Sequence, residues 1–598
     1  MYLPNLLNHF RKKRSNWKNA LIAVAVLAVI FLIFTVGSLG ELNELGLRRL
    51  TGWPGGQSYL VIFQNDAERR PTGGFITAYA TLKFRFGIPS ITFGNVYDEK
   101  LIQPGTENPD PTIAELIGGP FFPGHGFRDG NFQPDFPATA EELIRLYRLG
   151  YPEAEFDGVI AVDFTAFEDL VKATGMEIGE AGLFAMIEQE IQDVDLHNPE
   201  ELQNRKNFLT DIAKSVIRKA ILAPWNYSDV TRSVIGSLDS KHSLLYFRDD
   251  KLQSRVREKA WDGALPSVSN SDLLAVNEGN YGGMKSSRYI TRDTFYDVDF
   301  SEDPEEGLVA TANLKVQLAH RGDTAEPISG YYKSYWRIFT PLGTQKISGK
   351  VNQTFDDGFR QVWGRVINMN PGEEREIDLK YVLPSTVVRD DTYRLKLVKQ
   401  PGSGNDFVRV SLKLPTGYLF QVPGNRESAF AEASPFAKAT EDKSADRQGR
   451  TGLDVKENLV VYQTLLDGDK ELELKIIPDT TPPRLAWQEF IGPGLKTIDL
   501  RFNEALGRES VRKATFELAD MNYRNKRFDS VEILQVRFLP PQNLHLDLRG
   551  VTPECREWYE LTIDGLSDQH GNMITNKKVT VVQWLDEGGR ICDPDRKL

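Results

Sequence analysis

The chain has 598 residues, which is more than one domain usually holds, so we expect two or three folded units. Hydrophobic residues make up 40% of it and charged residues 26%, a balance typical of globular proteins. The net charge is −12. This acidity excludes nucleic acid as a partner, because binding phosphates requires a basic face.

A basic cluster opens the chain, with positive charges at Arg11, Lys12, Lys13, Arg14 and Lys18. Residues 20–39 follow and contain no charged side chain. About twenty apolar residues span a hydrocarbon core, and positive charges mark the cytoplasmic side. We therefore predict a cytoplasmic tail over 1–19, a single-pass membrane anchor over 20–39, and an extracytoplasmic bulk. A cleaved signal peptide is the alternative, although its apolar region is usually only about 7–15 residues long.

Cysteine and histidine are sparse. The two cysteines, Cys555 and Cys592, could form one disulfide in an oxidising compartment or remain separate thiols. The seven histidines are scattered, and no Cys/His cluster has the spacing of zinc ligands. The sequence therefore gives no indication of a zinc site.

Residues 157–175 form the clearest local unit. The apolar run 158–162 predicts a buried strand, and Asp163 is a plausible N-cap for the amphipathic helix that follows. Gly175 is a natural helix stop. Strands are predicted at 58–63, 75–86 and 90–96, and helices at 139–149, 180–193 and 204–222. Thr139 and Glu142 have the spacing of a capping box, and residues 101–137 are loop-like. The alternation of strands and helices predicts an α/β layered domain over 58–284.

The period changes to two from about Arg288. Strands are predicted at 310–319, 332–339, 376–382, 393–398 and 408–414, so residues 285–478 should form a β-sandwich-like region. In this region Trp336 and its tyrosine neighbours could stack on sugars or pack in the core. A Pro-Pro linker at 482–483 precedes strands at 498–502, 530–538, 544–548, 558–563 and 579–584. Residues 479–598 should therefore fold as a separate sandwich.

Several motifs resemble the bacterial family called domain of unknown function 4012. They are YLVIFQNDAERRPTGGFI at 59–76, RDGNFQPDFP at 128–137, the 157–175 unit and KHSLLY at 241–246. The likeness covers roughly residues 58–384. Residues 482–488, 498–506 and 559–572 are similar to a bacterial Ig-like domain. The expected fold class is thus α+β multidomain, with a transmembrane helix, an α/β layered domain, a β-sandwich-like region and a C-terminal Ig-like sandwich.

The first domain is also distantly similar to the LytR–CpsA–Psr phosphotransferases, which transfer glycopolymers from a polyprenyl pyrophosphate lipid. A pyrophosphate is bound by guanidinium forks, and magnesium prefers carboxylate oxygens. The resemblance implies catalytic roles for Arg70, Arg128 and Asp129, ligand contacts for Arg205, Lys206 and Asp163, and a magnesium ligand at Asp66. The turn after Arg70 reads Pro-Thr-Gly-Gly, and it lacks the aspartate that those enzymes carry there.

Each candidate also has a structural interpretation. Arg128 and Asp129 could form a local ion pair, Asp163 could serve only as a cap, and Arg205 could lie on a solvated helix face. The chain contains no G-x-S-x-G elbow, no P-loop and no H-E-x-x-H motif. Two functions therefore remain open. One is a membrane-anchored envelope scaffold that binds a glycan or a protein without catalysis. The other is a glycopolymer phosphotransferase that uses magnesium and a polyprenyl-linked substrate.

Overall fold

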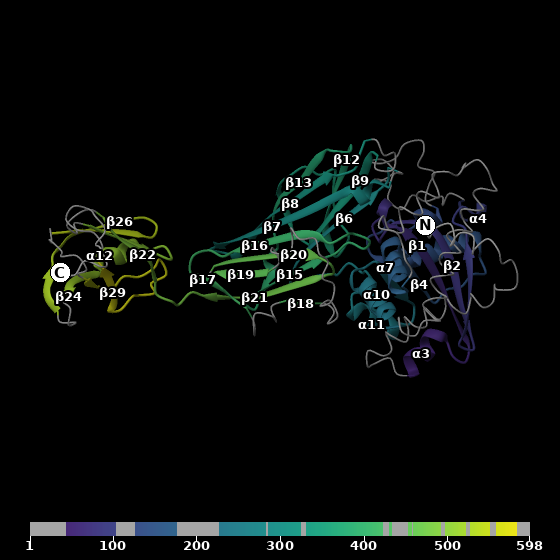
Figure 1. Cartoon of the computed structure of the whole chain (residues 1–598), viewed down its shortest axis with the longest axis horizontal. Coiled ribbons are helices and arrows are strands. Elements are labelled where there is room, and N and C mark those ends of the chain that lie inside the picture. The colour runs from purple at the N-terminus through teal and green to yellow at the C-terminus, as the bar shows by residue number, and fades with distance from the viewer. Residues whose placement is uncertain are drawn as a thin grey trace. The chain divides into compact units, whose positions relative to one another are not determined.

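Figure 1 shows the computed structural model of the chain. The structure describes residues 44–102, 126–175, 227–282, 285–324, 330–422, 430–432, 452–456, 458–491, 497–521, 527–549 and 558–582. The chain divides into two compact units. The first unit holds residues up to 412 together with 422–454 and 461–475, and the second holds 413–421, 455–460 and 476–598.

The protein is β-rich and built from several sheets, so the predicted α+β class is wrong. Five sheets contain 5, 7, 9, 4 and 4 strands. Of the five sheets, only the first has described helices packed against both of its faces. The strands that fill the described chain from residue 272 onward therefore decide the class, and the strand–helix alternation near the start does not.

The predicted anchor over 20–39 and the basic tail before it lie outside the described residues. Within the described ranges, no helix combines the length and the apolar character that a membrane crossing requires. This finding contradicts the single-pass localisation predicted from the sequence. Cys555, Cys592 and the helices predicted at 180–193 and 204–222 also lie outside the described residues.

The first unit begins with a five-stranded sheet in the order β3-β2-β1-β4-β5. Its strands are β1 (Gly56–Asn65), β2 (Phe75–Arg85), β3 (Ile88–Gly94), β4 (Gly158–Asp163) and β5 (Ser243–Phe247). Strands β1 and β4 are parallel, whereas the other neighbours are antiparallel. The parallel pair brings the carboxyl ends of β1 and β4 to the same edge of the sheet.

Helices cover both faces of this sheet, and together they form what we call the α/β layer (Figure 1). Its helices are α3 (Glu44–Thr51), α4 (Glu99–Ile102), α6 (Phe136–Gly150), α7 (Phe164–Ala173), α10 (Tyr227–Asp239) and α11 (Asp250–Glu258). Leu60 and Ile62 of β1 pack in one core with α6, and Tyr59 and Val61 pack in the other with α3, α10 and α11. Because both faces are covered, β1 reads as a continuous apolar run.

The strand–helix unit at 157–175 is confirmed, but the capping box is not. Asp163 caps α7 by accepting from the Ala166 amide at 2.9 Å, and Gly175 has φ +67°. Helix α6 begins three residues before Thr139, with Asp135 as its cap, accepting from the Ala138 amide at 3.1 Å. A proline stands in the first turn of α6, where its missing N–H costs no hydrogen bond.

The strand region of the first unit contains two larger sheets. The central strands of one run β10-β13-β8-β7-β16-β20, and those of the other run β11-β12-β9-β6-β15-β21. Their bounds, with those of the four short strands that flank them, are β6 (Asp272–Asn280), β7 (Ile290–Asp303), β8 (Gly307–His320), β9 (Tyr332–Pro341), β10 (Gln345–Ser348), β11 (Gln353–Asp356), β12 (Arg360–Met369), β13 (Glu374–Val382), β14 (Val388–Arg389), β15 (Thr392–Val398), β16 (Asp406–Lys413), β17 (Tyr418–Gln421), β18 (Phe430–Glu432), β19 (Gly452–Lys456), β20 (Leu459–Leu466) and β21 (Lys470–Pro478).

Side chains from both sheets meet in a buried interior. Trp336 is fully buried, so it belongs to the core and is not available to stack on a sugar. Asp272 of β6 is also fully buried, and it accepts hydrogen bonds from the Tyr296 hydroxyl at 2.7 Å and the Tyr393 hydroxyl at 2.6 Å. Because Tyr296 belongs to β7, the Asp272 carboxylate links one sheet to the other.

The second unit contains two four-stranded sheets, β22-β23-β27-β26 and β25-β24-β28-β29. They are made of β22 (Leu485–Ile491), β23 (Thr497–Phe502), β24 (Thr515–Met521), β25 (Arg527–Val531), β26 (Ile533–Leu539), β27 (Asn543–Leu548), β28 (Trp558–Asp564) and β29 (Lys577–Val582), with one helix, α12 (Arg508–Lys513). Leu500 of β23 and Leu561 of β28 lie in the same core, so the two sheets pack face to face.

Candidate functional site

Two acidic side chains lie at the carboxyl ends of the parallel strands β1 and β4. Asp66 follows the last residue of β1, and Asp163 is the last residue of β4. The register pairs Gln64 with Asp163, so the two strands end almost level. In sheets with parallel strands, ligands bind in the crevice outside such carboxyl ends. This edge of the sheet is therefore the candidate site.

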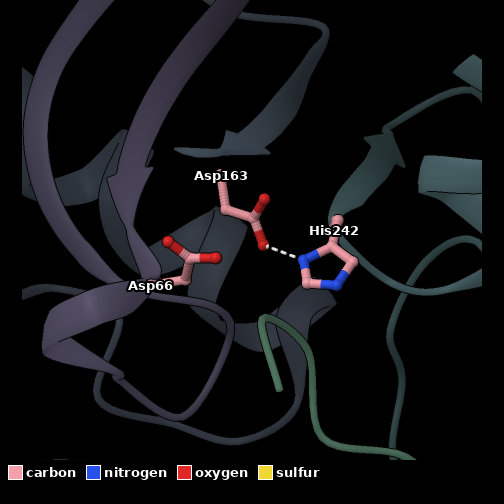
Figure 2. Close-up of side chains that lie close together, drawn as sticks. All are labelled: Asp66, Asp163 and His242. Carbon is pink, nitrogen blue, oxygen red and sulfur yellow. Dashed lines mark hydrogen bonds and ion pairs between the residues drawn. The ribbon is translucent and has the colours of Figure 1, made fainter. Parts of the chain in front are cut away.

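His242 joins the two aspartates from the start of β5. Strand β5 runs antiparallel to β4, and the Asp163 amide donates to the His242 carbonyl at 3.0 Å. This backbone contact places the imidazole Nδ1 2.5 Å from Asp163 Oδ2, as Figure 2 shows. Thr165, near the start of α7, donates its hydroxyl to the Asp66 carboxylate. One ligand atom from each of Asp66, Asp163 and His242 lies within 4.8 Å of the others.

Burial governs the protonation of this cluster, because it disfavours every charged form. Burial, helped by the nearby Asp163 carboxylate, raises the pKa of Asp66 to about 6. Burial also raises the pKa of Asp163 to about 8, against the opposing hydrogen bond from Ala166. The pKa of His242 falls, first through burial and then through the Lys399 ammonium. The raised pKa of Asp163 and the lowered pKa of His242 both favour the uncharged forms of the two side chains.

The turn at residues 69–74 comes shortly after Asp66 in the chain. Its first arginine, Arg69, faces the strand region. The Arg69 guanidinium donates to Glu278 of β6, and its Nε donates to the Gly402 carbonyl at 3.1 Å. Glu278 is fully buried and also accepts from the Tyr332 hydroxyl. The Asn280 amide donates to the Arg69 carbonyl at 2.8 Å. Arg69 thus connects the α/β layer to the nine-stranded sheet.

Arg70 is only 7% exposed, and its charge is already matched by neighbouring groups. Its Nη2 lies 3.1 Å from a Glu68 oxygen and 3.8 Å from an Asp129 oxygen. The guanidinium also lies over the Tyr281 ring, 4.3 Å from the centroid. Arg128 Nε lies 3.3 Å from the other Asp129 oxygen, which confirms the local ion pair. Asp129 is therefore shared by two of the three predicted phosphate-binding arginines, and Glu68 supplies a second negative charge to Arg70.

The rest of the turn is held by side-chain amides. Asn277 donates to the Pro71 carbonyl at 2.9 Å, and Asn131 donates to the Gly74 carbonyl at 2.6 Å. A Cβ on Gly402 would lie 2.4 Å from the Gly73 carbonyl oxygen, so these two backbones touch. We call residues 69–74 and these contacts the joint, because they bind the α/β layer to the strand region within the first unit.

The structure therefore groups the predicted site residues differently from the sequence. Asp66 and Asp163 come together with His242, whereas Arg70, Arg128 and Asp129 form a separate ion-pair cluster. Arg205 and Lys206 lie outside the described residues. Sequence reasoning missed His242. The sequence clue to His242 was its position directly before the apolar run SLLYF. In the structure this position lies beside the end of β4.

Comparison with known proteins supports part of the predicted resemblance. Residues 54–180 match the family described as protein of unknown function (DUF4012), which supports the predicted resemblance over that part of the chain. The comparisons show neither the likeness to LytR–CpsA–Psr enzymes nor an Ig-like domain. No curated protein matches the chain.

Two solved structures are similar over parts of the chain. One is described as a nutrient binding protein from Legionella pneumophila, with 10% identity and a TM-score of 0.20, covering 31% of this chain and 67% of that one. The other is the adhesin domain of Epf from Streptococcus pyogenes, with 13% identity and a TM-score of 0.12, covering 47% and 82%. At such low TM-scores, neither likeness contributes to the functional argument.

Proposed function

We propose that this protein is a non-catalytic scaffold whose β-strand surfaces bind a protein or a glycan. The observation that carries the proposal is the internal use of Arg70. The Arg70 guanidinium is 7% exposed and already paired with Glu68 and Asp129, so it is poorly placed to bind a pyrophosphate. Burying a charge is costly unless it is paired, so withdrawing Arg70 from these carboxylates to bind a ligand would be unfavourable.

The joint gives these residues a different role. Arg69 is engaged by Glu278 and by the Gly402 carbonyl, both of which belong to the strand region. A motif that resembles a phosphate-binding turn therefore fixes the α/β layer against the sheets that follow. Rigid attachment of successive layers is what a scaffold requires.

Exposed apolar side chains favour binding as the function of the strand region. Phe359 is 59% exposed and Leu342 is 45% exposed. Arg360 pairs with Pro341 across β12 and β9, so the residues next to that pair, Phe359 and Leu342, lie at the same end of the sheet. Phe355 of the adjacent β11 is 38% exposed. Apolar groups gathered on a surface are typical of interaction sites.

The alternative function is a phosphotransferase of the LytR–CpsA–Psr type. One observation favours it, namely the meeting of Asp66 and Asp163 at the carboxyl ends of two parallel strands. In that case Arg128, whose side chain is 29% exposed, would have to contact the pyrophosphate. This reaction also needs magnesium, which carboxylate oxygens could bind.

A transfer assay separates the two functions. The full chain is incubated with a glycopolymer on a polyprenyl pyrophosphate, an acceptor glycan and Mg²⁺, and release of the polyprenyl phosphate is measured. The scaffold proposal predicts no release above the protein-free rate. Release that falls by about one to two powers of ten in Arg128→Ala would overturn it, since a charge-assisted hydrogen bond is worth about 1.5–3 kcal/mol.

A further inference from the structure

We propose that Asp66, Asp163 and His242 together bind one divalent transition-metal cation of the zinc class. This inference goes beyond the scaffold function and does not depend on it. The three side chains come from three segments that the sheet holds in fixed positions: the end of β1, the end of β4 and the start of β5. Their convergence therefore follows from backbone pairing, and it does not depend on flexible surface side chains.

The geometry requires only small movements to accept an ion. Zinc binds carboxylate oxygen and imidazole nitrogen at about 2.0–2.2 Å, so tetrahedral ligand atoms stand about 3–3.5 Å apart. The three ligand atoms lie within 4.8 Å of one another, with Asp163 Oδ2 and His242 Nδ1 2.5 Å apart (Figure 2). A cation would replace the proton between Asp163 and His242 and draw Asp66 inward.

The donor set selects the class of metal. Imidazole suits zinc and related transition metals, whereas magnesium and calcium prefer ligand sets made of oxygen. Two carboxylates and one neutral imidazole carry two negative charges, which a divalent cation balances. Three protein ligands also leave a fourth position open for water or another ligand.

The two acidic side chains of the cluster contact His242 and Thr165 directly, and their nearest cations lie further away. Within the described ranges, neither Asp66 nor Asp163 forms an ion pair with a lysine or an arginine. The two nearby cations are engaged elsewhere. Arg69 pairs with Glu278, and the Lys399 ammonium donates to the Ser403 carbonyl at 2.5 Å and its hydroxyl at 3.0 Å. Buried carboxylates are normally paired or coordinate a metal.

Hydrogen bonds from neighbouring groups already orient the two proposed carboxylate ligands. Asp163 Oδ1 is fixed by the Ala166 amide, which leaves Oδ2 for an ion, and Thr165 holds the Asp66 carboxylate. Such outer contacts usually accompany metal ligands. Gln64, the strand partner of Asp163, is 4% exposed, and its side-chain nitrogen has no hydrogen-bond partner. Because Gln64 pairs with Asp163, this buried donor belongs to the strand next to the cluster.

The test measures zinc binding by the full chain. The protein is stripped with a chelator and then titrated with Zn²⁺ in competition with a chromophoric chelator. We expect one zinc per chain, and a loss in affinity of about tenfold or more in Asp66→Asn and in His242→Gln. Circular dichroism checks that both variants are folded. Asp163 is left unchanged because it also caps α7.

The second unit offers a matched control. His545 also contacts two aspartates, but its Nδ1 faces Asp499 and its Nε2 faces Asp547, so the two carboxylates lie on different sides of the ring. His545→Gln should therefore leave zinc binding unchanged. X-ray absorption at the zinc edge should show nitrogen and oxygen neighbours at about 2.0–2.1 Å and no sulfur at about 2.3 Å.

Three results would overturn the proposal. They are a chain that takes up no zinc, a His242→Gln variant that binds as tightly as the wild type, and sulfur in the zinc coordination shell. Magnesium that competes with zinc at equal concentration would overturn the assigned class of metal. Because the readout is binding, it is separate from the transfer assay, and either proposal can fail while the other stands.

Discussion

The joint predicts a large loss of stability when Arg69 is replaced by methionine. The Arg69 side chain is 11% exposed and its partner Glu278 is fully buried, so Arg69→Met leaves a carboxylate in the interior with the Tyr332 hydroxyl as its remaining side-chain donor. Breaking a buried ion pair by removing one partner costs about 3–5 kcal/mol. We expect a loss of this size in the free energy of unfolding of the first unit.

A double-mutant cycle makes the reasoning quantitative. In Arg69→Met with Glu278→Met the buried charge is gone, and the main remaining cost is the unpaired Tyr332 hydroxyl, about 1–3 kcal/mol. The double variant should therefore be more stable than Arg69→Met alone. The assay is denaturant unfolding of the full chain followed by tryptophan fluorescence, with the transition of each unit fitted separately.

Arg128→Met is the matched control for this cycle. Its side chain is 29% exposed, and the pair that it forms with Asp129 is partly solvated, so its loss should cost less than about 1 kcal/mol. Equal costs for Arg69→Met and Arg128→Met would refute the reasoning. So would a double variant that is less stable than the sum of the two single changes.

Two further predictions concern the strand region and the joint. Burial raises the pKa of Asp272 to about 6, so the folded protein holds a proton there that the unfolded chain releases near pH 4. The free energy of unfolding should therefore fall by a value on the order of 3 kcal/mol as the pH rises from 4 to 7. The Asp272→Asn variant should not show this decrease. Parallel pH profiles of the two proteins would contradict the assignment. Gly402 has φ +70° and touches Gly73, so Gly402→Ala should cost about 1–3 kcal/mol in thermal or denaturant unfolding. Gly404→Ala, where a Cβ meets no atom within 4 Å, should change stability by less than about 0.5 kcal/mol, and similar costs at both positions would argue against the close contact.

Local features of the fold could be predicted from the sequence because their causes are local. The strand, cap and helix at 157–175 depend on residues that follow one another directly, and they occur as β4, Asp163 and α7. The cap of α6 was misplaced because two capping patterns lie close together. Pro137, one residue inside the helix, was the signal that favoured Asp135 over Thr139.

The partners of the site residues could not be predicted in the same way. His242 reaches Asp163 across 79 positions, and Arg69 reaches Glu278 across 209. Such contacts depend on which strands pair and in which register, and a single sequence does not state this. For the same reason the scattered histidines gave no indication that His242 meets Asp66 and Asp163, because spacing along the chain says little about side chains that a sheet brings together.

The fold class was misjudged for a related reason. The α/β domain was predicted to extend to residue 284, yet β6, which lies inside that range and is buried along its whole length, pairs with β9 and β15 in the nine-stranded sheet. An apolar run shows that a strand is buried, but it does not show which sheet the strand joins.

The most direct test of the scaffold account is a calorimetric titration of the full chain with a polyprenyl pyrophosphate in the presence of Mg²⁺. Because Glu68 and Asp129 already neutralise Arg70, the account predicts no saturable binding, and Arg70→Lys should behave as the wild type does. Saturable binding that weakens by about tenfold or more in Arg70→Lys, with the fold intact, would contradict the account and favour the phosphotransferase.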